Sequence, residues 1–491
     1  MAFSERKKMK LSQLFPDTAP IEITGLALDS RKVKPGDIFF CLEGLESDGH
    51  RYADKAAAAG ACAIVHSKPL DRLPDVVYIH VPDVTAELNR VSDLFYDSPS
   101  RKMTIFGITG TNGKTTISMI LRNLYSHCKP TGYIGTVGVE YFQVHRDASL
   151  TTPDQIELQG DLAEMYAAGI RAAAIEISSH GLVQRRTENI DVDCAVFTNL
   201  TRDHMDYHHT MEAYFEAKKL LFSGMKKDGI AVLNADDPTL NDLASCCACP
   251  YVTYSIESGK GADYQAESLV LGPRFTEFTL VHRGKRYPVR CNLIAAYNIS
   301  NLLAVIAALH SQGMELESII PLLDHIPQVP GRMEVVDEGQ SYHVIVDFAH
   351  TPDAFDKVFD FAQRVRHPEG KVYAVFGSSG RRDVGKRPIM GEIAGRFCDE
   401  IVTTQDDPRD EDPAAIGAVI LEGAARSGCP GIFIERRAEA IEYVLKKARP
   451  HDLVLLLGQG RQPYVIKADG YREPYDGDPE AARKLIHQYF L

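Results

Sequence analysis

Short apolar runs and amphipathic stretches alternate along almost the whole chain. Near the start, residues 33–37 form a predicted turn, and the apolar residues 37–42 that follow predict a strand. Residues 52–60 have an alanine-rich helical pattern that ends at a glycine, and a further strand begins within residues 61–65. Strands that alternate with helices predict an α/β layer domain.

The rest of the chain repeats this alternation twice. The middle part has a predicted helix at 297–309 and continuously apolar predicted strands at 103–108, 172–177, 194–198, 230–233 and 251–254. The last third has predicted strands, separated by helical segments, at 344–348, 372–376, 401–404, 432–434 and 453–457. Such strands are typical of parallel sheets that helices cover on both faces. We therefore expect a mostly parallel central sheet and a Rossmann-like C-terminal domain.

The chain length sets the number of domains. A chain of 491 residues suggests about three of them. Residues 98–101 and 327–332 contain proline, serine or glycine and are predicted linkers. We therefore predict three α/β domains, at 1–100, 101–330 and 331–491.

Composition narrows the class of protein. Hydrophobic residues make up 44% and charged residues 25%, as in globular proteins, and the net charge of −13 argues against non-specific nucleic-acid binding. No apolar run approaches the roughly 20 residues of a membrane span, and the charged start lacks the apolar core of a secretory signal. We therefore expect a cytoplasmic protein. The cluster of Cys246, Cys247 and Cys249 could bind a soft metal, but no partner CxxC pair accompanies it, which favours reduced thiols.

A glycine-rich loop is the most informative segment. Residues 107–116 read GITGTNGKTT, after a predicted strand and before a predicted helix. The glycines at 110 and 113 allow backbone N–H groups to approach phosphate oxygens, while Lys114 can reach the β- and γ-phosphates and Thr115 can ligate Mg²⁺. The standard phosphate loop has a glycine where this chain has Ile108. The Asn-Lys-x-Asp motif of GTPases is absent from the sequence.

Several motifs together resemble the Mur ligase family. TGTNGKTT at 109–116 resembles the ATP loop that this family shares with folylpolyglutamate synthetases, and that loop lacks the same first glycine. Further family segments follow in order: EISSHGL at 176–182, TNLTRDHMDYH at 198–208, NADDP at 234–238, YN at 297–298, GRME at 331–334 and DFAH at 347–350. The resemblance covers almost the whole chain. DSRKVKPG at 29–36 resembles the uridine-binding start of the MurE and MurF types, and VQRR at 183–186 resembles the MurE type alone.

The resemblance implies an activity. MurE-type ligases use ATP to add a diamino acid to the D-glutamate of UDP-N-acetylmuramoyl-L-alanyl-D-glutamate. The reaction runs through an acyl phosphate, releases ADP and phosphate, and serves peptidoglycan synthesis and so cell shape and division. The three domains would then bind uridine, ATP and the amino acid in chain order, in a protein that we expect to be a monomer.

The resemblance also implies an ATP and metal site. Its catalytic set is Lys114, Glu176, His204, Lys218 and Arg332. Mg²⁺ would be held by Thr115, Glu176, His204 and Lys218, the last as a carbamate formed with CO₂. The ATP-binding set is Gly110, Thr111, Asn112, Gly113, Lys114, Thr115, Thr116, Asn199, Asn298, Asn301, Arg332, Asp347 and His350. The residues alone also allow Lys218 to be a surface lysine and the histidine-rich segment 203–209 to be a zinc site, although no cysteine pair supports zinc.

Two further sets of residues would hold the other substrates. The acceptor set is Ser30, Arg31, Thr151, Thr152, Ser178, Gln184 and Arg186, and the amino-acid set is Arg382, Asp406, Asp407, Arg409, Gly458 and Gln462. Diaminopimelate enzymes have asparagine in place of Asp407 and glutamate in place of Gln462. Arg409 favours a diamino diacid, whereas the other two residues favour L-lysine or ornithine, and the balance leans slightly towards the latter.

Two alternatives remain at this point. A sister ligase, of the MurF type or a folylpolyglutamate synthetase, is disfavoured by the segment 178–186. A non-catalytic nucleotide-binding scaffold is disfavoured because the catalytic set is complete.

Overall fold

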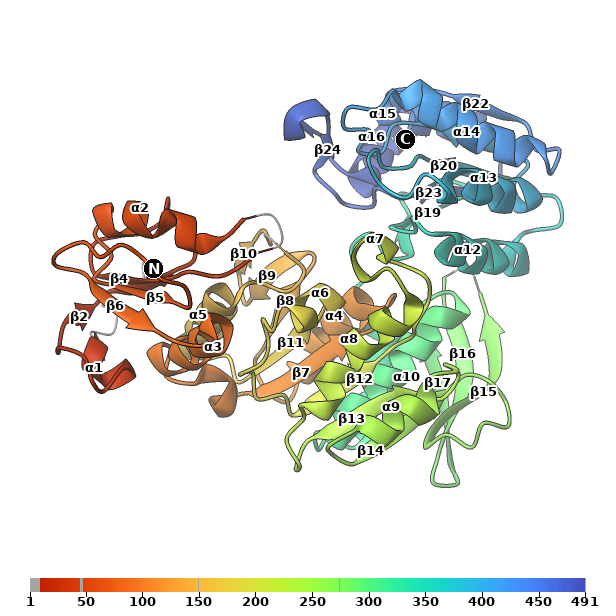
Figure 1. Cartoon of the computed structure of the whole chain (residues 1–491). Coiled ribbons are helices and arrows are strands. Elements are labelled where there is room, and N and C mark those ends of the chain that lie inside the picture. The colour runs from red at the N-terminus through yellow and green to blue at the C-terminus, as the bar shows by residue number, and fades with distance from the viewer. Residues whose placement is uncertain (1–8, 45–46, 149, 273, 491) are drawn as a thin grey trace.

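The computed structural model describes residues 9–44, 47–148, 150–272 and 274–490. Three sheets follow one another along the chain, each with helices packed against it (Figure 1). This arrangement confirms the predicted α/β fold in three domains. Within the described residues, no helix combines the length and the apolar character that crossing a membrane requires.

The N-terminal domain contains a four-stranded parallel sheet. Its strands, in spatial order, are β3 (Gly25–Ala27), β4 (Asp37–Phe40), β5 (Ala63–His66) and β6 (Val77–His80). Helices α1 (Leu11–Leu14) and α3 (Val84–Phe95) pack on one face, and α2 (Ala53–Ala58) packs on the other. A short antiparallel pair, β1 (Met9–Lys10) and β2 (Glu22–Ile23), and the 3₁₀ turn η1 (Gly49–Tyr52) complete this part.

The central domain is built on an eleven-stranded sheet. Its strands, in spatial order, are β10 (Val144–Arg146), β9 (Gly138–Tyr141), β8 (Thr131–Gly135), β11 (Ala172–Glu176), β7 (Thr104–Thr109), β12 (Cys194–Phe197), β13 (Ile230–Asn234), β14 (Tyr251–Ser255), β15 (Tyr264–Leu271), β16 (Thr276–His282) and β17 (Lys285–Cys291). The stretch from β8 to β15 is parallel, as the apolar pattern predicts. Both edges are antiparallel hairpins that the sequence did not predict.

Helices cover both faces of this central sheet. Helices α4 (Lys114–Tyr125) and α10 (Ala296–Ser311) share one core with it, and α5 (Gln155–Ala167), α8 (Met211–Ser223) and α9 (Leu240–Cys246) share the other. The short elements α6 (Ser179–Val183), α7 (Met205–His208), α11 (Leu316–Ile319) and η3 (Ile320–His325) connect them. The carboxyl ends of the neighbouring strands β11, β7 and β12 lie side by side, which is where open α/β sheets bind ligands.

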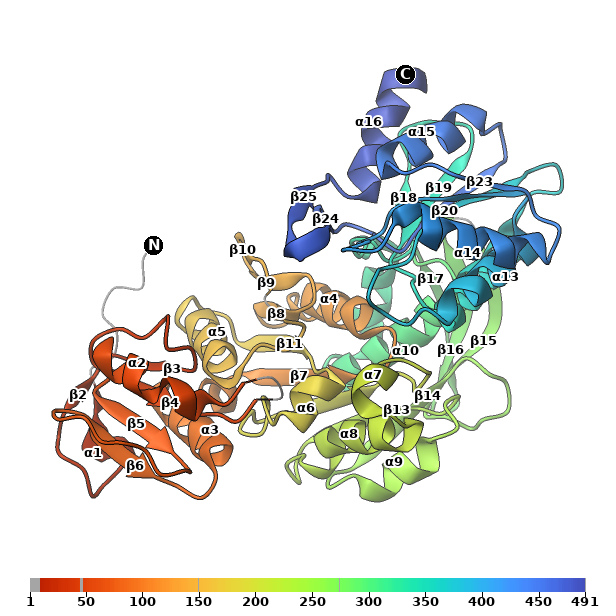
Figure 2. The ribbon, with the colours of Figure 1, turned by 45° about the horizontal axis from the view of Figure 1, so that its top comes forward.

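The C-terminal domain is a second doubly wound unit. Its sheet has the order β18 (Glu334–Val336), β19 (His343–Asp347), β23 (Leu453–Leu457), β20 (Val372–Phe376), β21 (Glu400–Thr403) and β22 (Gly431–Phe433), and only the first pair is antiparallel. Helices α12 (Pro352–Val365), α13 (Lys386–Phe397) and α14 (Pro413–Ala425) cover one face, and α15 (Arg437–Lys447) and α16 (Asp478–Phe490) the other. A small hairpin, β24 (Tyr464–Ile466) and β25 (Arg472–Pro474), joined by η4 (Ala468–Gly470), projects beside this sheet (Figure 2).

The first predicted linker is a packed turn. Residues 98–101 largely coincide with the 3₁₀ element η2 (Pro99–Lys102), in which Pro99 and Ser100 are buried. Ser98 adopts φ +48° to begin this element. The connection between the first two domains is therefore folded against them.

Candidate active site

The glycine-rich loop packs too tightly for side chains at its two glycines. Gly113 ends the loop with φ +90°, and a Cβ there would lie 2.4 Å from Asn301 Oδ1. Gly110 has φ +143°, and a Cβ there would lie 1.8 Å from Thr198 Oγ1. Glycine is therefore required at both positions, both for its backbone freedom and for the close approach.

Hydrogen bonds within the loop and from the residues that follow β12 hold the loop in place. Lys114 Nζ donates to the carbonyl oxygens of Gly110 at 3.0 Å and Thr111 at 2.9 Å. The backbone N–H of Asn112 donates to Asn199 Oδ1 at 3.0 Å, and the Thr198 hydroxyl donates to the Asn112 carbonyl at 2.6 Å. Burial lowers the pKa of Lys114, against the opposing effect of the Glu176 carboxylate. The loop thus places a lysine at the N-terminus of α4, which suits phosphate.

Glu176, at the end of β11, is the most heavily bonded carboxylate of the site. Its side chain is fully buried and accepts from the Thr115 hydroxyl at 3.0 Å and the Thr136 N–H at 3.1 Å. It also accepts from the hydroxyls of Tyr133 and Thr136. Gly135 leaves room for it, since a Cβ there would lie 2.3 Å from Glu176 Oε1. Thr115 and Glu176 therefore present oxygen atoms side by side, as a hard divalent cation requires.

A cavity of about 790 Å³ lies between the central and C-terminal domains. Most of the predicted ATP residues line it: Thr111, Asn112, Gly113, Lys114, Thr115, Thr116, Asn199, Asn298, Asn301, Arg332, Asp347 and His350. Glu176 and His204 of the predicted catalytic set line it too, whereas Gly110 and Lys218 do not. Thr151 and Ser178 from the predicted acceptor set also line it. The structure therefore brings residues from far apart in the chain to one space between two domains.

Three of these residues come from the C-terminal domain. The Arg332 guanidinium lies over the Phe348 ring and donates to Thr115 Oγ1 at 3.5 Å, so it reaches the phosphate loop. Asp347 accepts from the N–H groups of Met333 and Ala349, both at 2.8 Å, and burial raises its pKa.

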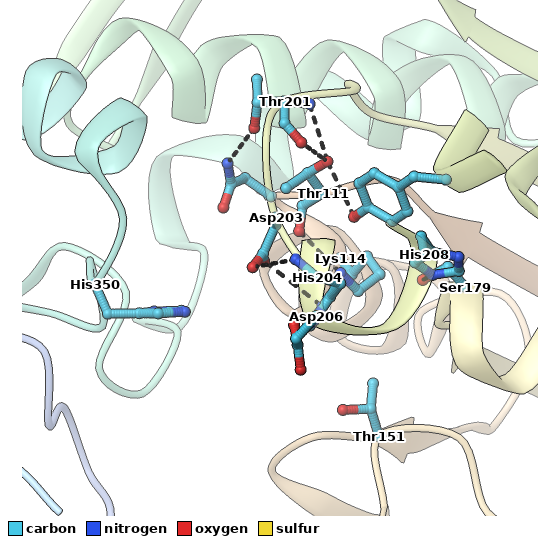
Figure 3. A network of polar contacts seen from close by, with 12 residues as sticks. Thr111, Lys114, Thr151, Ser179, Thr201, Asp203, His204, Asp206, His208 and His350 are labelled. Atoms are coloured by element: carbon cyan, nitrogen blue, oxygen red, sulfur yellow. Dashed lines mark hydrogen bonds and ion pairs between the residues drawn. The ribbon is translucent and has the colours of Figure 1, made fainter. Parts of the chain in front are cut away.

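His350 closes the same side of the cavity. Burial and the nearby Lys386 ammonium lower the pKa of His350 to about 4. Figure 3 shows its ring extending from the C-terminal domain towards Asp203 and Lys114.

Lys218 is buried in the middle of α8. Its side chain is 1% exposed, and its ammonium lies 4.1 Å from the centre of the Tyr214 ring. Burial, together with the Lys114 charge, holds the pKa of Lys218 well below its usual range. Within the described part of the chain, no carboxylate forms an ion pair with Lys218. The alternative of a surface lysine is therefore wrong.

His204 lies close to Lys218 in a group of aromatic rings. Its ring is 4.9 Å from that of His180 and 6.1 Å from that of Tyr214. His204 has φ +55°, and burial lowers its pKa (Figure 3). His208 instead hydrogen-bonds Ser179 Oγ at 2.8 Å. Among the residues that the structure describes, no group of three or more His, Cys, Asp or Glu side chains is arranged to hold a metal ion.

The predicted acceptor residues fall into two groups. Thr152 is fully buried, and its hydroxyl donates to the Glu176 carbonyl at 2.9 Å and accepts from the Ser178 N–H at 2.9 Å. Arg186 donates to the Thr152 carbonyl at 2.7 Å and also to Gln184 Oε1. These four residues form one connected patch at the end of β11.

Ser30 and Arg31 lie apart from this patch, in the N-terminal domain. The Arg31 side chain is 87% exposed and forms an ion pair with Asp29 at 2.7 Å. Neither residue lines the cavity between the central and C-terminal domains. The predicted acceptor set therefore spans two domains.

The predicted amino-acid residues gather in the C-terminal domain. Gln462 Nε2 donates to Asp407 Oδ1 at 2.9 Å and Oδ2 at 3.1 Å, although the two residues are 55 positions apart. Asp406 lies against Gly458, where a Cβ would lie 2.5 Å from Asp406 Oδ2, and burial raises the pKa of Asp406 to about 6. Asp407 and Arg409 both have positive φ, at +43° and +55°.

The arginines of the predicted amino-acid set have fewer hydrogen-bond acceptors than Lys114 of the phosphate loop. Arg409 Nε is buried and has no hydrogen-bond partner among the described residues. Arg382 is half exposed and lies 3.8 Å from Asp206 of the central domain. The Arg409 Nε–H thus lacks an acceptor within the described part of the chain, and the contact of Arg382 with the Asp206 carboxylate lies close to the limit of ion-pair distance.

Sequence reasoning missed several residues that hold the site together. Tyr133 and Thr136 hold Glu176, and Asp353 accepts from Asn112 Nδ2 at 3.3 Å across the domain boundary. They come from segments without a recognisable motif. Only the folded contacts reveal them.

Family models match most of the chain. The Mur ligase middle domain matches residues 108–309, the Mur ligase glutamate ligase domain matches 331–460, and the Mur ligase family catalytic domain matches 22–93. These three matches lie in the three structural domains in chain order.

Individual proteins are similar over nearly the full length. A UDP-N-acetylmuramoyl-L-alanyl-D-glutamate--2,6-diaminopimelate ligase from Bacillus cereus is 40% identical over 472 residues, 95% of this chain and 94% of that protein. A ligase of the same name from Gloeobacter violaceus is 40% identical over 468 residues, again 95% and 94% of the two chains. A solved structure of a ligase of this name is 31% identical, with a TM-score of 0.71, over 98% of this chain and 99% of that one. MurF ligase from Thermotoga maritima, solved with ADP, shares the fold at 19% identity, with a TM-score of 0.67 over 94% and 97% of the chains. The chain therefore belongs to the Mur ligase family of ATP-dependent ligases, and within it to the MurE type.

Proposed function

We propose that this protein adds meso-diaminopimelate to the D-glutamate of UDP-N-acetylmuramoyl-L-alanyl-D-glutamate, with cleavage of ATP to ADP and phosphate, in peptidoglycan precursor synthesis. The observation that carries the proposal is the shared cavity. Lys114, Glu176 and Arg332 meet there, and the acceptor residues Thr151 and Ser178 border the same space. A phosphoryl group and an acceptor carboxylate can therefore meet in one cavity.

The chemistry requires the neutralisation of developing negative charge. A carboxylate oxygen of the acceptor attacks the γ-phosphorus, and the bond to ADP breaks. The amine of the incoming amino acid then attacks the acyl carbon, loses a proton, and expels phosphate. Lys114 belongs to the phosphate loop and Arg332 reaches it from the C-terminal domain, so two cations can act on the phosphate in both steps. Closure of the two domains would exclude water from the acyl phosphate.

Thr115 and Glu176 are the residues that would hold one Mg²⁺, and His204 would hold a second. The Thr115 and Glu176 oxygen atoms are 3.0 Å apart and belong to a hydroxyl and a carboxylate, the ligands that this cation prefers. Bound Mg²⁺ would supply positive charge to the phosphate oxygens.

Lys218 is proposed to act as a carbamate. Its ammonium loses one proton to become an amine, and the amine adds CO₂ with loss of a second proton, so that a cation becomes an anion. An ammonium at this buried position repels Lys114 and has no carboxylate partner among the described residues, whereas a carbamate would attract both Lys114 and Mg²⁺. Intact-protein mass under native conditions should exceed the sequence mass by the mass of CO₂. A Lys218→Met variant should lack that increment, and an unmodified wild-type mass would contradict the proposal.

The choice of diaminopimelate rests on charge. Arg409 presents a buried, unpartnered Nε–H that suits a distal carboxylate, and Asp407 supplies a carboxylate for the distal ammonium. The relatives named for diaminopimelate support this choice. L-lysine or ornithine is the second candidate, because Asp407 and Gln462 depart from the residues of diaminopimelate enzymes.

One assay separates these candidates. The protein is incubated with ATP, Mg²⁺ and the UDP-linked dipeptide, and phosphate release is followed with each amino acid added separately. We expect release with meso-diaminopimelate to exceed release with L-lysine or ornithine by roughly a hundredfold in kcat/KM, about 3 kcal/mol. Release with lysine alone would establish the second candidate. Release with none of them would overturn the ligase assignment for this acceptor.

A further inference from the structure

A helix of the N-terminal domain holds the turn that follows Gln184. Helix α3 packs against α5 of the central domain (Figure 2). On it, Asn89 is 4% exposed, and its Nδ2 donates to the Arg185 carbonyl at 3.0 Å and to Glu188 Oε2 at 3.2 Å. The same amide donates to the Thr85 carbonyl at 3.0 Å, one helical turn earlier. One buried amide of the N-terminal domain thus binds both ends of the turn 185–188.

A charged contact strengthens this connection at the start of α3. Arg185 donates to both Glu188 oxygens, with Nε–Oε2 at 2.9 Å and Nη2–Oε1 at 2.8 Å, and through Nη1 to Asp83 Oδ2 at 2.6 Å. The other oxygen of Asp83 caps α3 by accepting from the Ala86 N–H at 2.9 Å. Arg185 has φ +56°, a backbone conformation that needs support from its surroundings.

The same turn also contacts the acceptor patch, and its Arg185 carbonyl accepts a second, longer hydrogen bond from Gln155 Nε2 at 3.5 Å. Arg186 directly follows Arg185 and donates to the Thr152 carbonyl at 2.7 Å. Gln155, at the start of α5, donates to the Gln184 carbonyl at 3.4 Å. The turn therefore lies between a helix of the N-terminal domain and the patch that borders the cavity.

We propose that Asn89, supported by the Asp83–Arg185 ion pair, is a positioning residue that sets Gln184 and Arg186 for the peptide end of the acceptor. This inference rests on the proposed function. The acceptor is long, with a nucleotide at one end and a carboxylate at the other, and its two ends would contact different domains. Such a ligand binds tightly only if the two contact regions keep a fixed spacing. Asn89 provides that fixed spacing, because it joins the N-terminal domain directly to the acceptor turn.

The test separates the three substrates. In Asn89→Ala the Arg185 carbonyl and the Glu188 carboxylate lose a buried donor, so we expect the KM for UDP-N-acetylmuramoyl-L-alanyl-D-glutamate to rise by roughly tenfold. The KM values for ATP and the amino acid should stay within about twofold. Asn89→Asp keeps the size of the side chain but removes both N–H donors and adds a charge beside Glu188, so it should be at least as impaired as the alanine variant. A role in packing alone would leave the aspartate variant close to wild type.

Ser92→Ala is the matched control. Ser92 lies on the same helix and is fully buried, and its hydroxyl has no partner among the described residues. It should therefore keep the wild-type KM for all three substrates.

An exposed variant guards against loss of folding at Asn89. Asp83→Ser keeps a helix-capping residue but removes the ion pair with Arg185, so the acceptor KM should rise by about two- to threefold. If the Asn89 variants do not fold, an unchanged acceptor KM in Asp83→Ser overturns the inference. Wild-type acceptor KM in folded Asn89 variants, or equal KM increases for all three substrates, would also overturn it. If the wild-type protein shows no activity with this acceptor, that result would instead contradict the proposed function.

Discussion

The phosphate loop and the residues of the C-terminal domain that are predicted to bind the amino acid differ in how completely their polar groups are partnered. Glu176 accepts four hydrogen bonds, and Lys114 donates to two carbonyls of its own loop. In the C-terminal domain, Arg409 Nε is buried without a partner among the described residues, and Arg382 has only a 3.8 Å contact with Asp206. Hydrogen bonds thus already hold Glu176 and Lys114 in place without ATP. The predicted amino-acid residues, by contrast, include guanidinium groups without a close acceptor in the part of the chain that the structure describes.

The largest effect on kcat/KM is expected at Glu176, beside the phosphate loop. Glu176→Gln removes the charge proposed for Mg²⁺ and places an NH₂ group among hydroxyl and N–H donors, so kcat/KM should fall by roughly 10²–10³-fold. Steady-state kinetics across a range of Mg²⁺ concentrations would measure it. Glu212→Gln, at an exposed position on α8, is the control and should match wild type. A loss below tenfold in Glu176→Gln would place the metal elsewhere.

The next prediction tests whether Arg409 binds the distal carboxylate of the amino acid. Arg409→Met should lower kcat/KM for meso-diaminopimelate by roughly a hundredfold, because the distal carboxylate loses its charged donor. The KM for ATP should not change, since Arg409 does not line the ATP cavity. Arg381→Met, which removes a neighbouring exposed arginine paired with Asp410, is the matched control. Equal losses for lysine and diaminopimelate would show that Arg409 serves the fold instead of the side chain of the substrate.

A double exchange tests the paired residues of this pocket. Asp407→Asn leaves two amides facing each other, and Gln462→Glu leaves two carboxylates, so each change should cost about tenfold in kcat/KM. The double variant restores one carboxylate and one amide in exchanged places and should recover to within about threefold of wild type. A double variant as impaired as the product of the two single variants would show that the residues act independently.

The last prediction concerns the free energy of unfolding instead of activity, and it tests His350 at the boundary between the two regions. The pKa of His350 is about 4 in the folded protein against an ordinary value of 6.5, so the unfolded chain binds more protons between these values. The contribution of His350 to stability is therefore present above pH 6.5 and lost as the pH falls towards 4. His350→Asn should reduce the stability lost between pH 7.5 and pH 5 by about 2 kcal/mol, measured by denaturant unfolding. His367→Asn, at an exposed histidine, should keep the wild-type profile. An unchanged profile in His350→Asn would contradict the burial argument.

The same contrast explains what the sequence could reveal. The phosphate loop is contiguous, so the strand, the two glycines and Lys114 could be read directly, and the burial of Lys218 agrees with its match to the family lysine. The contact between Asp407 and Gln462 joins segments 55 residues apart, and no local pattern encodes it. Nothing in the sequence distinguishes Asn89 from other polar helix residues, and only the folded chain shows its hydrogen bond to the Arg185 carbonyl. The hairpin edges of the central sheet were missed because their strands mix polar and apolar residues.

An oxygen-transfer experiment tests the central claim most directly. The acceptor is labelled with ¹⁸O in the side-chain carboxylate of its D-glutamate and incubated with ATP, Mg²⁺ and meso-diaminopimelate. If that carboxylate attacks the γ-phosphorus and the acyl phosphate is then opened by the amine, each released phosphate carries one oxygen from the acceptor. Mass spectrometry of the phosphate should therefore show one ¹⁸O atom per amide bond formed. Phosphate without label, released together with the ligated product, would contradict the acyl-phosphate route and with it the proposed role of the shared cavity.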